Sequence, residues 1–355
     1  MLQSILLTVL AAQGAAPVAS RWSVAADRSL QWEGATYQPI GARIAPTPEL
    51  IRASKEAGIQ DLLVEVPGSP SAWNETLLQL EEGGTRYWLM NSGLVPSCRG
   101  TVVEPESYRF SPVTGRTNLD LSLPGATEAL IVVSTQRDSI IRQHLRVPVV
   151  NGRLQATLDP DAPGDHIALL YPVVEDARVP DAWDGLDTYR DEFLASRRQW
   201  GELKSLRGIV NPIGTLPQFP DAEIRFVPTS PRFQSEFAEV LRKKYTSVPR
   251  LEIAWTLGSN DLKTFEQAAA LVPLWSERRG LAVVWDPTQN RILKVDRRQT
   301  TIWKDIQDAT LGALRRRYRN FVDVLSNELG VPVVQSWAGW NGPYVKNADE
   351  LKDPW

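Results

Sequence analysis

The segment Leu206-Arg-Gly-Ile-Val-Asn-Pro-Ile-Gly214 determines how the rest of the chain is interpreted. Its first five residues form a short apolar run, and the Asn-Pro-Ile-Gly sequence that follows is typical of a turn. A short apolar run that ends in a turn predicts a buried β-strand leading into a loop. We therefore expect a strand over 206–210, with a loop that begins at Asn211.

Two helices are expected after this loop. Ser230 is suited to cap the first, and Pro231 is suited to its first position. The second is expected over about 261–271 and ends before Pro273. The first, over about 231–244, is predicted by apolar residues at helical spacing: Phe233, Phe237, Val240 and Leu241.

This region resembles a segment of a known enzyme family. The residues are Phe233-Gln-Ser-Glu-Phe-Ala-Glu-Val-Leu-Arg-Lys-Lys-Tyr245 and Leu251-Glu-Ile-Ala-Trp255. They look like the segment after the fourth strand of family-42 glycoside hydrolases, which are β-galactosidase-like enzymes of clan A. The family pattern there is approximately F-x-x-(W/F)-L-x-x-K-Y…L-N-x-A-W. The resemblance extends over about 206–275, and it implies a (β/α)8 TIM-type barrel and a carbohydrate substrate, a β-galactoside or related glycan.

Strands and helices alternate on both sides of this region, which is typical of a parallel sheet. Further helices are expected over 181–203 and 301–329. Closing an eight-stranded barrel would require about three more β/α units, so we expect a truncated product or a fragment. Five strands of the barrel are expected, over 38–44, 61–67, 85–90, 206–210 and 331–335, with helices over 46–57 and 71–82 between the first three.

The alternation is interrupted over 100–176, where no helical period is found. Asn151-Gly152 lies between two strand-like runs and predicts a hairpin. We interpret this stretch as a β-sandwich-like module inserted into the barrel, with either a carbohydrate-binding or a structural role. The expected organisation is a signal peptide (1–20), the first part of the barrel (21–99), the module (100–176) and the continuation of the barrel (177–355). The strand-like runs of the module are 107–110, 118–123, 129–134, 140–150, 153–158 and 166–173.

Composition limits the classes of partner. The chain has 355 residues, is 43% hydrophobic and carries a net charge of −3, as expected for a soluble globular protein without a nucleic-acid-binding surface. Its one cysteine, Cys98, excludes an internal disulfide. Two histidines cannot form a His-rich metal site, and no phosphate-binding loop is found, so we expect no cofactor. Unpaired strand edges would favour association, which leaves oligomerisation open.

Residues 1–20 have the character of a secretory signal peptide. An apolar core over 5–12 is followed by small residues through Ala19 and Ser20. This core is too short to span a bilayer, and no other run is long enough. We expect a secreted or periplasmic protein; the alternative is a buried N-terminal strand or helix.

Neither catalytic carboxylate of the family can be transferred to this chain. The family places its acid/base Glu directly after an Asn at the end of the fourth strand. Asn211 matches that Asn, but Pro212 follows it, and proline cannot exchange a proton. The family nucleophile, at the end of the seventh strand, would lie beyond Trp355. Substitutes would have to come from the face where barrel active sites lie, and the candidates are Asp221, Glu223 and Glu65.

Candidate sugar-binding residues lie where the expected strands end: Arg43, Asn91, Asn211, Trp337 and Trp340. The two tryptophans are suited to stacking on sugar rings. Glu65 has a structural alternative, an ion pair with Arg43. Three functions stay open: a secreted glycosidase, an inactive carbohydrate-binding barrel, which Pro212 favours, and a structural surface protein.

Overall fold

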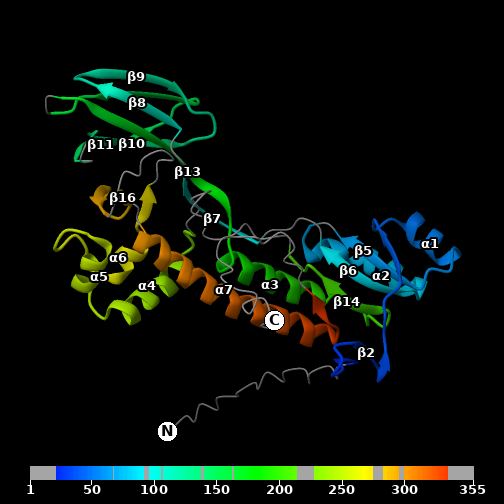
Figure 1. Ribbon diagram of the computed structural model, residues 1–355. Coiled ribbons are helices and arrows are strands. Elements are labelled where there is room, and N and C mark those ends of the chain that lie inside the picture. Colours follow the sequence, from blue (N-terminus) through cyan, green and yellow to red (C-terminus); the bar gives the residue numbers. More distant parts are fainter. Residues whose placement is uncertain are drawn as a thin grey trace, which may run out of the picture. The chain divides into compact units, whose positions relative to one another are not determined.

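The computed structural model describes residues 21–66, 68–91, 96–104, 107–136, 140–161, 164–213, 228–274, 283–295 and 300–334 (Figure 1). The chain divides into two compact units. Unit 1 comprises the described parts of 1–92, 193–212 and 322–336, and unit 2 comprises those of 93–192, 213–321 and 337–355. The signal peptide expected over 1–20 lies outside the described residues.

A five-stranded parallel sheet forms the centre of unit 1. All five strands occur where the sequence predicts them, and their spatial order, β4-β5-β6-β14-β18, follows the order of the chain. The described strands do not close into a barrel. The protein is therefore a mixed α/β protein with one parallel sheet and several antiparallel ones. The strands are β4 (Gly41–Ile44), β5 (Asp61–Val66), β6 (Arg86–Asn91), β14 (Leu206–Val210) and β18 (Val333–Val334).

Helices connect the first three strands. Helix α1 (Pro48–Glu56) is capped by Thr47, whose side chain accepts a hydrogen bond from the Leu50 amide. A 3₁₀ turn, η1 (Pro70–Trp73), leads into α2 (Asn74–Gly83), which ends at Gly84 in the left-handed conformation. The fully buried residues of the sheet include Leu62, Val64, Leu89 and Ile209.

A small three-stranded sheet precedes the parallel one: β1 (Trp22–Val24), β2 (Leu30–Trp32) and β3 (Ala35–Thr36). Its second turn contains Glu33 and Gly34, both with positive φ, which matches the twist of a tight hairpin. The turn at Gly34 therefore forms a tight β-hairpin.

Unit 2 contains the β-rich module. Its five-stranded antiparallel sheet has the order β11-β10-β13-β7, with β8 also paired to β13, and β9 and β12 form a separate ribbon. Asn151 and Gly152, both with positive φ, form the turn between β11 and β12. The sequence predicts every strand of this module except β7, which precedes the first predicted run at 107–110. The strands are β7 (Ser97–Val103), β8 (Tyr108–Val113), β9 (Thr117–Ser122), β10 (Glu128–Thr135), β11 (Ile141–Pro148), β12 (Arg153–Leu158) and β13 (His166–Pro180).

Both faces of this sheet are buried, as the side chains of β10 show. Ile131 and Val133 point into a core shared with the β9–β12 ribbon. Leu130 and Val132 point into a second core shared with Trp285 and its neighbours. Because successive side chains of a strand point to opposite faces, a strand covered on both faces is apolar throughout. The face with Leu130 and Val132 is covered by a three-stranded sheet. Its strands are β15 (Val272–Leu274), β16 (Val283–Asp286) and β17 (Arg291–Lys294).

The remaining helices differ in part from the prediction. Helix α4 (Pro231–Tyr245) agrees with it, and Ser230 caps this helix through the Phe233 amide. The helix expected over 261–271 is only α6 (Phe265–Ala269), because Thr264 caps it late. An additional helix, α5 (Val248–Trp255), precedes it, and Thr246 with positive φ separates α4 from α5. Helices α3 (Asp184–Arg197) and α7 (Thr300–Leu329) each begin in unit 2 and end in unit 1.

Candidate functional site

The carboxyl end of the parallel sheet carries a charged pair. Arg43 on β4 and Glu65 on β5 form a hydrogen-bonded ion pair, in which Nε and Nη2 of Arg43 both contact Oε1 of Glu65. Arg43 is largely exposed and Glu65 is half-buried. In α/β sheets, ligands bind at the carboxyl ends of the strands. The pair therefore lies where a binding site is expected, and it is the pairing that the sequence offers as the structural alternative for Glu65.

The pair lies on a face of the sheet that is only partly covered. The register places Arg43 opposite Leu63 and Glu65 opposite Met90. Because side chains alternate along a strand, Arg43, Leu63, Glu65 and Met90 share one face. Leu63 and Met90 are half-buried, as is Val210 opposite Met90 on β14. This face thus offers an acceptor and a donor beside accessible apolar surface.

Asn91 lies on the opposite face, because Val66 and not Glu65 is its register partner. Its side chain is buried, with 3% of the residue exposed, and Nδ2 donates to the Pro212 carbonyl oxygen at 3.0 Å. Asn91 therefore fixes the turn that follows β14. The structure does not bring it together with Glu65.

Asn211 is the first residue after β14 and has a positive φ of 49°. Its amide donates to the Val334 carbonyl oxygen at 2.7 Å, which continues the pairing of β14 with β18. Asparagine tolerates this conformation better than most residues. The other candidates, Asp221, Glu223, Trp337 and Trp340, lie outside the described residues.

The amino end of the same sheet is filled by a structural network. Tyr37 Oη donates to Asp61 Oδ1 at 2.6 Å and accepts from Trp88 Nε1 at 3.1 Å, and the rings of Tyr37 and Trp88 are stacked. Arg86 Nη2 donates to Asp61 Oδ2 at 2.8 Å, and its guanidinium lies over the Tyr37 ring. Asp61 is buried and has its hydrogen bonds within the protein. This network therefore stabilises the amino end of the sheet.

Alkaline pH should destabilise the protein through this network. Burial, and then the hydrogen bond to Asp61, raises the pKa of Tyr37 to about 12 from its ordinary 10.0. Between these two values the unfolded chain releases a proton that the folded protein retains, so stability is lost as the pH rises. We expect the urea midpoint to fall from pH 10 to pH 12, and to fall less in Tyr37→Phe. An equal fall in this variant would show that Tyr37 is not responsible.

The motif that carries the family resemblance has a structural role here. Its Lys244, Tyr245 and Trp255 all hydrogen-bond to one carboxylate, that of Asp305 on α7. Tyr245 Oη lies 2.6 Å and Trp255 Nε1 lies 2.8 Å from Asp305 Oδ2. The sequence did not single out Asp305, because nothing in its spacing links it to residues 50 to 61 positions earlier.

The described residues include no group of three or more His, Cys, Asp or Glu side chains that could hold a metal ion. No helix in this part of the chain is long and apolar enough to cross a membrane. The sequence matches neither a model of a known protein family nor a curated protein. The likeness of residues 206–275 to family-42 glycoside hydrolases therefore stays a hypothesis.

Proposed function

We propose that the protein binds carbohydrate on a scaffold of the (β/α)8 barrel type, at the carboxyl ends of β4 and β5. The observation that supports this proposal is the charged pair Arg43–Glu65 on a partly covered, apolar face of the sheet. Sugars present many hydroxyl groups and weakly polar ring faces. A carboxylate that accepts and a guanidinium that donates, next to apolar side chains, suit both features.

The order of the strands supports a scaffold of the barrel type. In a (β/α)8 barrel every parallel strand pairs with its predecessor and its successor in the chain. The five strands of unit 1 follow this rule, whereas a doubly wound sheet reverses its order at one point. The proposed scaffold is thus consistent with the resemblance carried by residues 233–255.

Binding without hydrolysis is the form of the proposal that the residues favour. Hydrolysis of a glycoside requires a carboxylic acid that protonates the leaving group and a second carboxylate. Pro212 occupies the position where the family has its acid/base Glu. Glu65 is the described carboxylate of this face, and its ion pair with Arg43 suits it to accept hydrogen bonds. A glycoside hydrolase is the second candidate.

Glycan binding by the full chain tests this proposal. We expect β-galactosides and related oligosaccharides to bind in titration calorimetry, and Arg43→Ala and Glu65→Gln to weaken binding about 10- to 100-fold. Hydrogen bonds to charged groups contribute about 1.5–3 kcal/mol each, which corresponds to this range. Arg153→Ala is the matched control, because Arg153 is 62% exposed, compared with 63% for Arg43, and is also ion-paired, to Asp120.

Turnover of aryl β-galactosides separates the candidates, and we expect none. Activity that Glu65→Gln abolishes would make Glu65 catalytic, and activity lost only in Asp221→Asn or Glu223→Gln would assign that role to Asp221 or Glu223. If no glycan binds, the proposal fails and a structural surface protein becomes the better hypothesis.

A further inference from the structure

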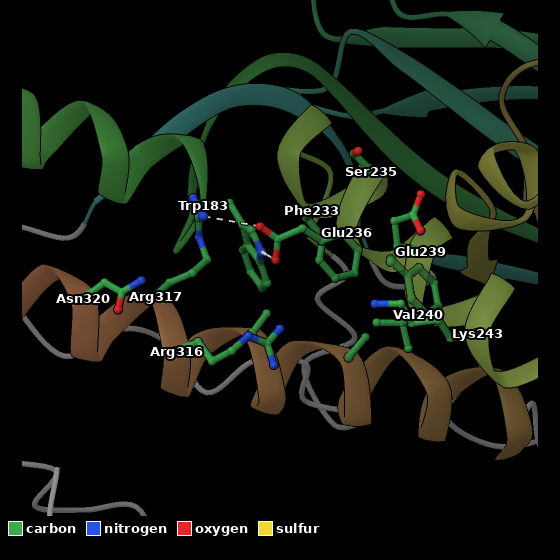
Figure 2. A pocket seen from close by; sticks show the side chains of 13 residues that line it. Trp183, Phe233, Ser235, Glu236, Glu239, Val240, Lys243, Arg316, Arg317 and Asn320 are labelled. Carbon is green, nitrogen blue, oxygen red and sulfur yellow. Dashed lines mark hydrogen bonds and ion pairs between the residues drawn. The ribbon is translucent and has the colours of Figure 1, made fainter.

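Unit 2 contains a pocket between α4 and α7, next to Trp183 (Figure 2). Its volume is about 390 Å³. Pockets for small molecules typically have about 300–1,000 Å³, so this one can hold a small organic ligand. It is separate from the carboxyl end of the sheet in unit 1, and the proposed function does not use it.

Three aromatic side chains line one side of the pocket. Trp183, Phe233 and Phe237 are all buried. The Trp183 and Phe233 rings meet edge to face with 4.9 Å between centroids, and Phe233 stacks on Phe237 at 5.4 Å. These packed rings give the pocket an apolar side.

Two of the charged residues of the pocket are already held by the protein. Glu236 Oε1 lies 3.3 Å from Arg317 Nη1, and Glu236 Oε2 accepts from Trp183 Nε1 at 3.2 Å. Arg317 also donates to Asp187 Oδ2 at 2.7 Å and to the Ala182 carbonyl oxygen at 3.3 Å. Glu236 and Arg317 therefore join the two helices to the start of α3 and neutralise each other.

Two further cations of the pocket have no such partner. Lys243 and Arg316 form no ion pair or hydrogen bond with another described residue, whereas the pocket's other acid, Glu239, is paired with Arg242. Figure 2 shows Lys243 on α4 and Arg316 on α7, on opposite sides of the pocket. Both acids of the pocket are engaged in ion pairs with other residues, so the pocket retains two positive charges that form no ion pair with a described acid.

We propose that this pocket binds a small organic anion whose carboxylate or phosphate group lies between Lys243 and Arg316. The apolar part of the ligand would lie against Val240, Ala309 and Ala313, which also line the pocket. A guanidinium and an ammonium group are suited to oxyanions, and hydrogen bonds between charged partners are the strongest in proteins. A neutral molecule of the same size would leave both cations without a counter-charge.

Titration calorimetry and ligand-observed NMR with the full chain test this inference. The probes are benzoate, phenyl phosphate, inorganic phosphate and the neutral benzyl alcohol. We expect benzoate or phenyl phosphate to bind in the millimolar range or tighter, and Arg316→Ala and Lys243→Ala each to weaken binding about tenfold. Both residues are exposed, so the variants should keep the wild-type melting temperature. Arg315→Ala is the control, because Arg315 is an exposed neighbour on α7 that does not line the pocket.

The relative affinities of the two aromatic anions identify the preferred oxyanion, and either order supports the inference. Binding of benzyl alcohol as tight as that of benzoate would overturn it, as would equal losses in Arg315→Ala and Arg316→Ala. Inorganic phosphate that binds as tightly as phenyl phosphate would contradict the apolar part of the site. The absence of binding by every probe at millimolar concentration would also overturn the inference.

Discussion

Replacing Asp305 by alanine is expected to lower the free energy of unfolding by about 3–5 kcal/mol, because it removes a carboxylate that accepts three hydrogen bonds, and hydrogen bonds to charged groups contribute about 1.5–3 kcal/mol each. Asp305 is 1% exposed and accepts hydrogen bonds from Lys244, Tyr245 and Trp255. Its loss leaves the buried Trp255 indole and the Tyr245 hydroxyl without their acceptor, and each unsatisfied group adds a desolvation cost. Urea unfolding followed by tryptophan fluorescence measures the change.

Asp308→Ala is the matched control, because Asp308 lies three residues later on the same helix and is exposed. This control should change stability by less than about 0.5 kcal/mol, as is usual for surface positions. Asp305→Asn should be less destabilising than Asp305→Ala, because the amide oxygen can still accept from Tyr245 and Trp255, and only Lys244 would face the amide nitrogen. A loss at Asp305 no larger than that at Asp308 would show that the motif residues do not depend on this carboxylate.

Gly185→Ala is expected to destabilise the protein by about 1–3 kcal/mol, although alanine is the better helix former. Gly185 lies in the first turn of α3, and a Cβ atom there would lie 2.6 Å from the Ser97 amide nitrogen and 2.9 Å from its Cα. These are backbone atoms of β7, which cannot move aside as a flexible side chain could. The Gly185 amide also donates to Asp181 Oδ2 at 2.7 Å, which holds the turn in place.

Gly83→Ala in α2 distinguishes packing from helix propensity. No atom lies within 4 Å of a Cβ added there, so this change should be neutral or should stabilise by up to about 1 kcal/mol. Thermal unfolding of both variants gives the comparison. If Gly185→Ala also stabilises the protein, the close approach of α3 to β7 does not constrain this position.

The fold of both units was largely predictable because local patterns determine it. Strands β5, β6 and β14 are short, mainly apolar runs that end at or just before Pro67, Asn91 and Asn211, and the hairpins turn at Asn151-Gly152 and Glu33-Gly34. The failures lie where tertiary contacts override a local pattern. Helix α5 was missed because it is only eight residues long, and its buried Trp255 is held by Asp305, which is distant in the sequence.

The candidate site was less predictable than the fold. An ion pair between Arg43 and Glu65 could be predicted because both residues lie near the carboxyl ends of predicted strands. The structure confirms this ion pair. The sequence pattern did not distinguish the two faces of β6. Asn91 was therefore grouped with Glu65, although the strand register places them on opposite faces. The pocket next to Trp183 left no signal, since its walls come from helices far apart in the chain.

The pairing of Ser97 with Pro180 affects how unit 1 can assemble during synthesis. Strands β6 and β14 are neighbours in the sheet, but residues 92–205 lie between them. Once β7 and β13 are paired, both ends of the module lie about one strand spacing apart, roughly 5 Å. Pairing β14 with β6 then closes a loop that is effectively much shorter than residues 92–205. The entropic cost of closing a loop grows with its length. If the module folds first, it therefore holds the chain segments before and after it close together. This lowers the entropic cost of pairing β14 with β6.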